Sequence, residues 1–233
     1  MIFTVASPGG LEIQASSGNA TLVASNAVRT TLRRITASAH GRLHAHPDFV
    51  GLQEGKLSRK DYAELLLRLL GLHAPIEEQL TRYDHDRVMA WRSSGSTPSR
   101  PTRLRMDLAY LGFGSASIAA AARADTLLPV IDCPAAALGC AWVVEGSSLG
   151  GAVLGQKLIA ILGSTGAKHG GAFLSSIPEQ ADRWRGCCAA VELCGSDALG
   201  RTTLENASVA TFDAFEAWFG KKPSCSDPQS PVD

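Results

Sequence analysis

The stretch ALGCAWVVEGSSLGGAVLGQKL, residues 137–158, decides the fold class of this chain. It lies inside the longest apolar run of the sequence, Ala135 to Leu162, and Pro134 just before that run suits the first turn of a helix. Three polar side chains interrupt the run: Glu145, Gln156 and Lys157. We therefore predict a buried core helix here rather than a helix that spans a membrane.

Glycines are unusually dense in this predicted helix, at Gly146, Gly150, Gly151 and Gly155. Glycine in a helix interior costs about 1 kcal/mol relative to alanine, so the cluster needs a compensating reason. Close packing of helices through small residues is one reason, and the pattern alone favours it. The alternative is a kinked helix whose bare backbone lies over a flat ligand and leaves room for a small gas molecule on its metal. A phosphate-binding loop is disfavoured, because the pattern GxxxxGK(S/T) is absent.

Helical patterns continue toward the N-terminus. A cap at Ser25 or Asn26 precedes a helix that ends at His46-Pro47, because the residue before a proline is pushed out of the α region. The apolar stripe of this helix comprises Val28, Leu32, Ile35, Ala39 and Leu43. A second helix starts with a capping-box pattern at residues 58–61, and Pro75 is expected to kink or break it near residues 71–74.

The remaining segments complete a helical protein. Loop composition marks two of them, residues 91–103 and 163–171. Further helices are expected near residues 103–111, 179–193 and 202–219, with little strand alternation and no internal repeat. We therefore predict an all-α, single-domain fold over residues 26–220, with a flexible N-terminal extension at residues 1–25 and a disordered tail at residues 221–233.

Charge and cysteine content narrow the class of protein. The 22 Lys and Arg residues balance the 22 Asp and Glu residues, so neither nucleic acid nor an anionic membrane surface is expected as a partner. The first residues, MIFTVASPGG, lack a basic region followed by an apolar one, so no secretion signal is indicated. The six cysteines include no CxxC pair. We therefore expect reduced thiols and a cytoplasmic location.

The helix within RTTLRRITASAHGRLHAH, residues 29–46, carries the first candidate site. At about 100° per residue, His40 lies at the edge of the apolar stripe and faces whatever packs against it. Arg33 lies on nearly the same face, about 10 Å away along the helix axis. An imidazole and a guanidinium so placed suit a flat ligand with a central metal and carboxylates at its edge, such as heme. Alone, a histidine at a helix edge is more often structural or a surface residue.

His44 follows His40 by four residues, so a zinc-binding histidine pair is an alternative. The residues between them are Gly-Arg-Leu, without the glutamate of HExxH. No ExxH pair appears on other helices to build a di-iron site. The pair therefore gives only weak support for a zinc site.

Two segments in register resemble the heme oxygenase family. TASAHGRLHAHPDFVGLQEGKLSRKDYAELLLRLLGLHAPIEEQL, residues 36–80, is similar to the N-terminal helices of that family, and LGCAWVVEGSSLGG, residues 138–151, looks like its distal-helix signature. The resemblance covers roughly residues 28–219 and is greatest to the bacterial subgroup associated with bacteriophytochromes. It implies a heme-oxygenase-like fold, with heme between a proximal helix and a kinked distal helix.

On the proximal side, the resemblance places His40 at the histidine that ligates heme iron. Arg33 falls where the family has a basic residue that pairs with a heme propionate. Arg185 matches a second propionate partner in the C-terminal half.

On the distal side, three glycines fall on the family's distal glycines: Gly146, Gly150 and Gly151. Ser147 stands where the animal enzymes carry an aspartate that organises distal water. Without that carboxylate, the water must be held by Ser147, Ser148 or backbone carbonyls such as that of Gly146.

The activity that the resemblance implies is oxidation of heme by O2 and external electrons to biliverdin, CO and ferrous iron. Heme is then both cofactor and substrate. The implied partners are an electron donor, ferredoxin or a reductase, and a bacteriophytochrome that accepts biliverdin. Three alternatives stay open: a heme carrier or sensor without turnover, a thiaminase-like all-α enzyme with a cysteine nucleophile, and a purely structural helical protein.

Overall fold

The computed structural model describes residues 27–93 and 96–220, and every regular element in these ranges is helical. The α-helices are α2 (Ala27–His44), α3 (Pro47–Glu54), α4 (Arg59–Thr81), α5 (Arg100–Tyr110), α6 (Ser115–Ala119), α7 (Pro134–Gly155), α8 (Leu158–His169), α9 (Gln180–Cys194) and α10 (Ala198–Gly220). Two 3-10 helices, η1 (Ala90–Ser93) and η2 (Asp125–Leu127), lie in the connections. The all-α prediction is confirmed. The cap at Ser25 or Asn26, the extension at 1–25 and the tail at 221–233 lie outside the described residues.

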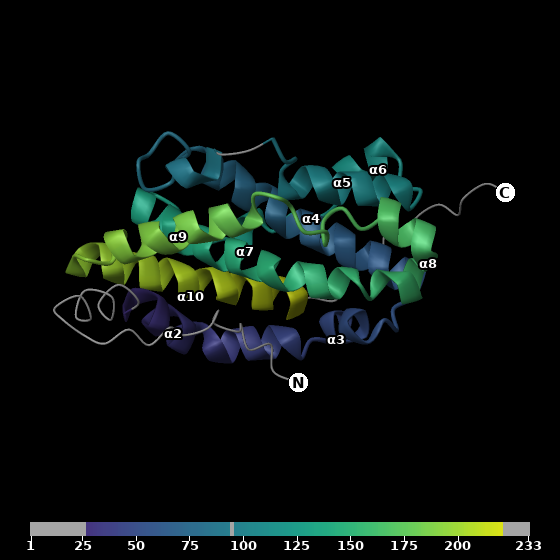
Figure 1. Cartoon of the computed structure of the whole chain (residues 1–233), viewed down its shortest axis with the longest axis horizontal. Coiled ribbons are helices and arrows are strands. Elements are labelled where there is room, and N and C mark those ends of the chain that lie inside the picture. Colours follow the sequence, from purple (N-terminus) through teal and green to yellow (C-terminus); the bar gives the residue numbers. More distant parts are fainter. Residues whose placement is uncertain (1–26, 94–95, 221–233) are drawn as a thin grey trace, which may run out of the picture.

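Helix α7 occupies the centre of the bundle (Figure 1). It packs along α10 and α9, and α10 packs in turn along α2. Helices α4 and α5 pair with each other and form the opposite edge of the molecule together with α6 (Figure 1). Helix α10 therefore joins the predicted proximal helix, α2, to the predicted distal helix, α7.

The apolar stripe predicted for α2 faces the core. Val28, Leu32 and Ala39 are buried, and Ile35 and Leu43 pack against the core from its edge. Helix α2 ends at His44, close to the predicted end, but Pro47 then starts the short helix α3, which the sequence did not indicate. Proline is well suited to this first helical position, because its missing N–H has no partner to lose there.

Helix α4 confirms one prediction and corrects another. Its capping box is present, since the Ser58 side chain accepts from the Asp61 N–H and the Asp61 side chain accepts from the Ser58 N–H. Pro75 does not break the helix, which runs without interruption to Thr81. Pro75 has no N–H for the carbonyl of Gly71, and the N–H of Ala124 donates to that carbonyl instead, at 2.9 Å.

The two predicted loops are shorter and more ordered than their composition indicates. Helix α5 starts at Arg100, inside the predicted loop at 91–103, and Arg100 is buried rather than on the surface. The loop predicted at 163–171 is mostly helix α8. A kink at Gly163, with φ of 73°, divides that helix and accounts for the loop-like sequence.

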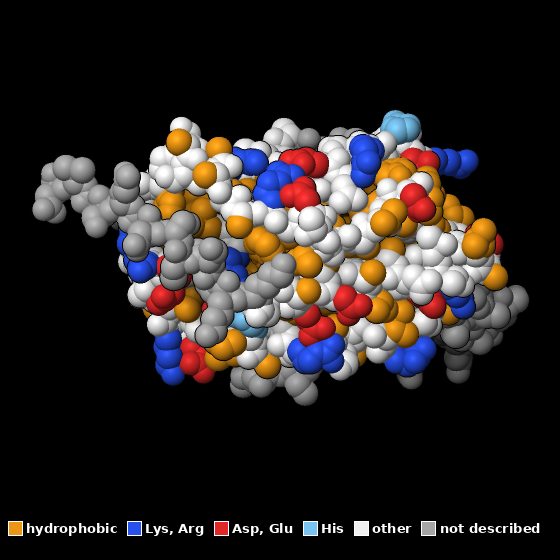
Figure 2. Space-filling model, turned by 180° about the vertical axis from the view of Figure 1, so that it is seen from behind, with side chains coloured by type: hydrophobic (Ala, Val, Ile, Leu, Met, Phe, Trp, Pro, Cys, Tyr) orange, Lys and Arg blue, Asp and Glu red, His pale blue; other side chains and the backbone are white. Residues whose placement is uncertain are grey.

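Helix α7 is long and apolar enough to cross a membrane by length and composition. Of its apolar window, 56% is buried inside the protein, and the core helix of a globular protein passes the same test. Charged groups on the surface are mixed in sign. Figure 2 shows Lys and Arg side chains beside Asp and Glu side chains over one face, with hydrophobic atoms between them. That face presents no extended field of one charge.

Candidate functional site

His40 lies exposed on α2, beside His44 one turn further along. Their ring centroids are 4.3 Å apart, and the two Nε2 atoms are 3.1 Å apart. The ring of Phe212, from α10, meets the His40 ring edge-on at 6.1 Å. His40 therefore stands at the rim of the α2–α10 contact with one face open to a ligand.

A short chain of hydrogen bonds sets the tautomer of His40. The Gln53 amide nitrogen lies 3.2 Å from Nδ1 of His44 and donates to it. His44 then carries its proton on Nε2 and donates it to Nε2 of His40. The His40 Nε2 lone pair therefore faces His44 at the surface of α2 and accepts its hydrogen bond, and an imidazole lone pair of this kind is what a metal ligand uses.

The local environment keeps His40 neutral. Partial burial, together with the neighbouring His44, lowers the pKa of His40 below its ordinary value. A neutral imidazole is the form that binds metals. In the described part of the chain, no group of three or more His, Cys, Asp or Glu side chains could hold a metal ion, so the zinc-pair alternative has no further ligands there.

Arg33 and Arg185 belong to one seam between α2 and α9. One turn before Arg33, the Arg29 guanidinium bonds Glu192 at 2.9 Å and also reaches the Cys188 thiol. Since α9 runs opposite to α2, the next turn of α9 after Cys188 in this direction carries Arg185. Both Arg33 and Arg185 are exposed, and Arg185 bonds Asp182. The two predicted propionate partners are thus exposed cations on two helices that pack against each other.

The α7 glycines divide into two kinds. Gly139, Gly146 and Gly150 lie within about 40° of one another around the helix, at about 100° per residue. A methyl group built at Gly139 would lie 2.5 Å from the Leu204 carbonyl oxygen of α10, which requires the helices to be that close. A methyl group built at Gly150 would meet no atom within 4 Å. On this one face of α7, helix α10 fills the space beside Gly139, whereas the space beside Gly150 is open.

The other glycines of the cluster have close neighbours. A methyl group at Gly146 would lie 3.6 Å from the Trp184 ring of α9. One at Gly151 would lie 3.6 Å from the backbone of Leu174, and one at Gly155 only 3.1 Å from it. Packing therefore accounts for Gly155 in full and for Gly151 in part, whereas it gives no reason for Gly150.

The two serines of α7 have different surroundings. The exposed Ser147 hydroxyl donates to the Val144 carbonyl at 2.8 Å. The Ser148 hydroxyl turns the other way, donates to the same carbonyl at 3.3 Å and accepts from Arg100 at 2.9 Å. Of the two hydroxyls, only that of Ser147 remains on the open side of the helix.

Behind α7 lies a buried ion-pair network that the sequence did not indicate. Glu145 pairs with Arg100 at 2.8 Å and with Arg183 at 2.6 Å, while Glu77 pairs with Arg100 at 2.9 Å and with Arg92 at 2.8 Å. The one available signal was Glu145 itself, a carboxylate within a strongly apolar helix. Such a group requires a buried partner, but the sequence did not identify which arginine supplies it.

Three of the described cysteine thiols are poor nucleophiles. Burial raises the pKa of the Cys140 thiol to about 11 and that of Cys187 well above its ordinary value. Burial also raises the pKa of Cys188, although Arg29 bonds that thiol. These thiols stay protonated at neutral pH, which removes the support for a cysteine-based enzyme.

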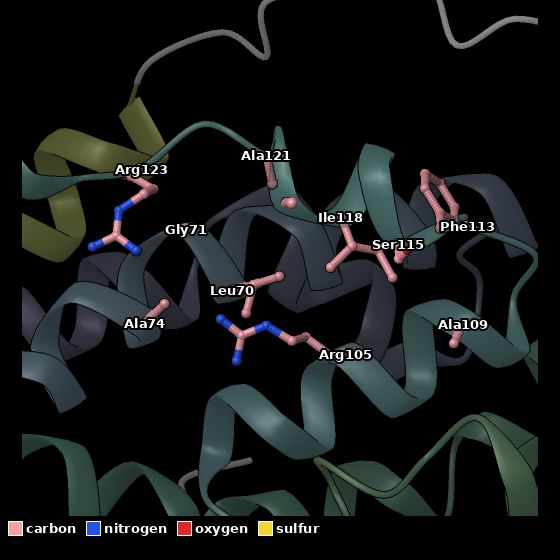
Figure 3. A pocket seen from close by; sticks show the side chains of 11 residues that line it. Leu70, Gly71, Ala74, Arg105, Ala109, Phe113, Ser115, Ile118, Ala121 and Arg123 are labelled. Carbon is pink, nitrogen blue, oxygen red and sulfur yellow. The ribbon is translucent and has the colours of Figure 1, made fainter.

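A pocket of about 480 Å³ lies elsewhere, between α4, α5 and α6 (Figure 3). Its walls are mainly apolar, with Leu70, Ile118 and Phe113, and two arginines, Arg105 and Arg123, line it as well. None of its lining residues is a predicted site residue, and none carries a side chain that ligates iron. The pocket therefore does not suit heme.

The arrangement of α2, α7 and α9 fits heme on three counts. His40 offers a neutral imidazole, Gly150 offers bare backbone with open space above it, and Arg33 and Arg185 offer cations for carboxylates. Each feature was expected from the sequence by residue, and the packing of α10 on both α2 and α7 joins them.

Comparisons with known proteins agree with this fit. The sequence profile of the heme oxygenase family matches residues 26–221. The heme oxygenase of Leptospira interrogans is similar in structure, with a TM-score of 0.67 and 18% identity over 82% of this chain and 98% of that chain. Heme oxygenase-1 from the cyanobacterium Synechocystis sp. PCC6803, solved in complex with heme, gives a TM-score of 0.63 and 15% identity over 83% of this chain and 90% of that chain. The comparison with curated proteins found no match.

The family match extends over most of the chain and over all the candidate site residues. It confirms the resemblance of residues 36–80 and 138–151, and with it an enzyme of the heme oxygenase type for which heme is cofactor and substrate. The structural likenesses, at 15–18% identity, show the same fold independently. The chain belongs to the heme oxygenase family.

Proposed function

We propose that this protein cleaves heme, with O2 and external electrons, to biliverdin, CO and ferrous iron. The observation that carries the proposal is the pairing of two surfaces on α10. One is the neutral His40 on α2, and the other is the open glycine face of α7 at Gly150. Bound heme would supply the iron that binds O2 and the macrocycle that is oxidised.

The proximal residues bind and orient the substrate. His40 ligates through Nε2 once it exchanges its hydrogen bond with His44 for the metal. A neutral histidine is a moderate axial ligand that supports O2 binding. Arg33 and Arg185 would offer cations to the carboxylates of the bound heme and so help to fix its orientation.

The distal residues leave room and hold a proton nearby. Gly150 would let the α7 backbone approach the macrocycle, because no described side chain intervenes there, and Gly146 and Gly151 would extend this face toward Trp184 and Leu174. Ser147 is the exposed hydroxyl on this side, and it already donates to the Val144 carbonyl. Its oxygen is therefore free to accept from a water molecule, which is the function that an aspartate has in the animal enzymes.

The proposed activity also suggests partners and a location for the protein. We infer an electron donor, ferredoxin or a reductase, and a bacteriophytochrome that accepts the biliverdin. The bacterial subgroup that this sequence resembles supports the second of these, and cysteines without a CxxC pair support a cytoplasmic location. Mixed surface charge gives no support for nucleic acid or membrane as a partner.

Hemin titration followed by reduction tests this function. The wild type should give the absorption spectrum of a histidine-ligated heme, and His40→Ala should lose it. Ascorbate or a ferredoxin system should then replace the Soret band by a biliverdin band. A spectrum unchanged in His40→Ala would contradict the assignment of the ligand.

A heme carrier or sensor is the second candidate, and the serine at position 147 favours it, because no carboxylate stands there to organise distal water. The same reduction separates the two functions. Heme that stays intact under reducing conditions, while His40 remains its ligand, would identify a carrier.

A further inference from the structure

Two residues on the face of α7 opposite its glycine face, Glu145 and Ser148, are held by contacts with other helices. At about 100° per residue, Glu145 and Ser148 lie about 60° apart on the helix. Gly146, Ser147 and Gly150 lie about 130–170° away from the midpoint of that edge. Any contact that fixes Glu145 and Ser148 therefore fixes where the glycine face points.

Arg100 is the residue that makes both contacts. Its guanidinium pairs with the Glu145 carboxylate at 2.8 Å and donates to the Ser148 hydroxyl from Nη2 at 2.9 Å and from Nε at 3.2 Å. It also pairs with Glu77 of α4 at 2.9 Å. The planar fork of an arginine demands one orientation of its partners, which a single point charge does not.

The surrounding network compensates the charges of these contacts. Glu77 also bonds Arg92, Arg92 bonds Asp84, and Arg183 joins Glu145 to the Arg92 carbonyl. Three arginines and three carboxylates thus balance in charge. The Arg100 and Glu145 side chains are only 6% and 4% exposed. In such buried surroundings, the removal of one partner leaves a charge uncompensated. The charged side chains therefore have few alternative positions.

Helix α7 needs contacts from other helices to hold it at this point. Its glycines lower its own helix propensity, and at Gly150 no atom of the described residues lies within 4 Å of the side-chain position. A further hydrogen bond reinforces the back side, from the Gln180 amide to the Ser148 carbonyl at 2.6 Å. The helix is thus held on one face and bare on the other.

We propose that Arg100 is a positioning residue, which sets the rotation of α7 through Glu145 and Ser148 and so aims Gly146, Ser147 and Gly150 at the bound heme. This inference rests on the proposed function, because it names what holds the distal face of that same site. Arg100 does not touch the substrate and acts through α7.

Two charge-balanced double variants test the inference. Arg100→Met with Glu145→Gln removes the Arg100 contacts with α7, whereas Arg92→Met with Asp84→Asn removes an ion pair of the same network whose described bonds go to α4 and to the segment after it. The first should speed amide hydrogen exchange in residues 145–155 of the heme-free protein by about tenfold or more, the loss expected for hydrogen bonds to a charged group. It should also shift the pH midpoint of the ferric-heme absorption spectrum and broaden the mixture of biliverdin isomers. The second should leave all three near wild type.

Several outcomes would overturn the inference. It fails if both variants behave alike, or if the first speeds exchange without moving the pH midpoint, since the network would then stabilise the protein without aiming α7. Should that variant not fold, Arg100→Lys retains the charge but loses the fork to Ser148, and it should show the same changes against an Arg92→Lys control. Failure of the proposed function appears elsewhere, as a wild type that gives no histidine-ligated heme spectrum.

Discussion

The two halves of α7 use glycine for opposite purposes. In the first half, Gly139 lets α10 approach so closely that the Ser208 hydroxyl reaches the Gly139 carbonyl at 3.1 Å. In the second half, Gly150 continues the same stripe, but nothing lies within 4 Å of the position its side chain would take. Residues 136–145 are all buried, and none of the described side chains from 146 to 155 is.

This difference shows what a glycine pattern does and does not encode. The sequence marks where side chains are absent, and both halves look alike in that respect. Whether the vacated surface is filled by another helix or left for a ligand depends on where α10 crosses α7. The choice between packing and ligand binding is therefore not a choice for the whole cluster. It is made glycine by glycine.

Gly150→Leu should have the largest effect. The added side chain occupies the face over which the macrocycle lies, so hemin affinity should fall about a hundredfold, or roughly 2.7 kcal/mol. The melting temperature of the heme-free protein should stay close to wild type, because the side chain enters open space. Hemin titration and thermal unfolding measure the two effects. Normal affinity and turnover in this variant would assign Gly150 to packing after all.

The same small substitution in each half should have opposite signs. Gly139→Ala forces a methyl group to 2.5 Å from a backbone oxygen and should lower the free energy of unfolding by about 2 kcal/mol. Gly150→Ala meets nothing and should raise it by about 0.5–1 kcal/mol, the ordinary gain for alanine in a helix. Denaturant unfolding of both variants gives the answer. Equal losses of stability would mean that the two halves do not differ as described.

The smallest effect concerns pH and His40, the proposed iron ligand. Burial and His44 lower the pKa of His40, so the neutral form that ligates iron persists to lower pH. Removing one of these causes, in His44→Gln, should raise the pKa of His40. Hemin affinity should then begin to fall at a higher pH than in the wild type. Hemin titrations across a pH series measure the midpoint, and a midpoint that moves to lower pH would contradict the assigned cause.

Much of the fold was predictable because helices are local. The stripe from Val28 to Leu43 and the capping box at Ser58 and Asp61 depend on residues a few positions apart, and both are as expected. Pro75 was misjudged because its compensation comes from Ala124, almost fifty positions later. The segment 91–103 was misjudged for the same kind of reason, since its arginines are buried by carboxylates on α4 and α7.

The candidate site shows the same difference between features set by nearby residues and features set by distant ones. His40, Arg33 and the α7 glycines were named from local spacing and a family resemblance. Phe212, which packs against His40, lies in a helix that was expected near residues 202–219, but its contact with His40 was not expected. The ion-pair network around Arg100 was not expected at all, because four helices and η1 must come together to form it.

The hydrogen bond from Ala124 to Gly71 links two stretches of sequence, α4 and the 122–124 segment, so that changes in one affect the other. A side chain at position 71 would lie 2.1 Å from the Ala122 carbonyl oxygen, so that position accepts glycine alone while the 122–124 segment stays where it is. Restoring an N–H at position 75 would set up competition for the carbonyl that Ala124 now uses. We therefore expect substitutions at position 71, at position 75 and in the 122–124 segment to be tolerated together but not singly. Relatives of this protein should then differ at all three places or at none.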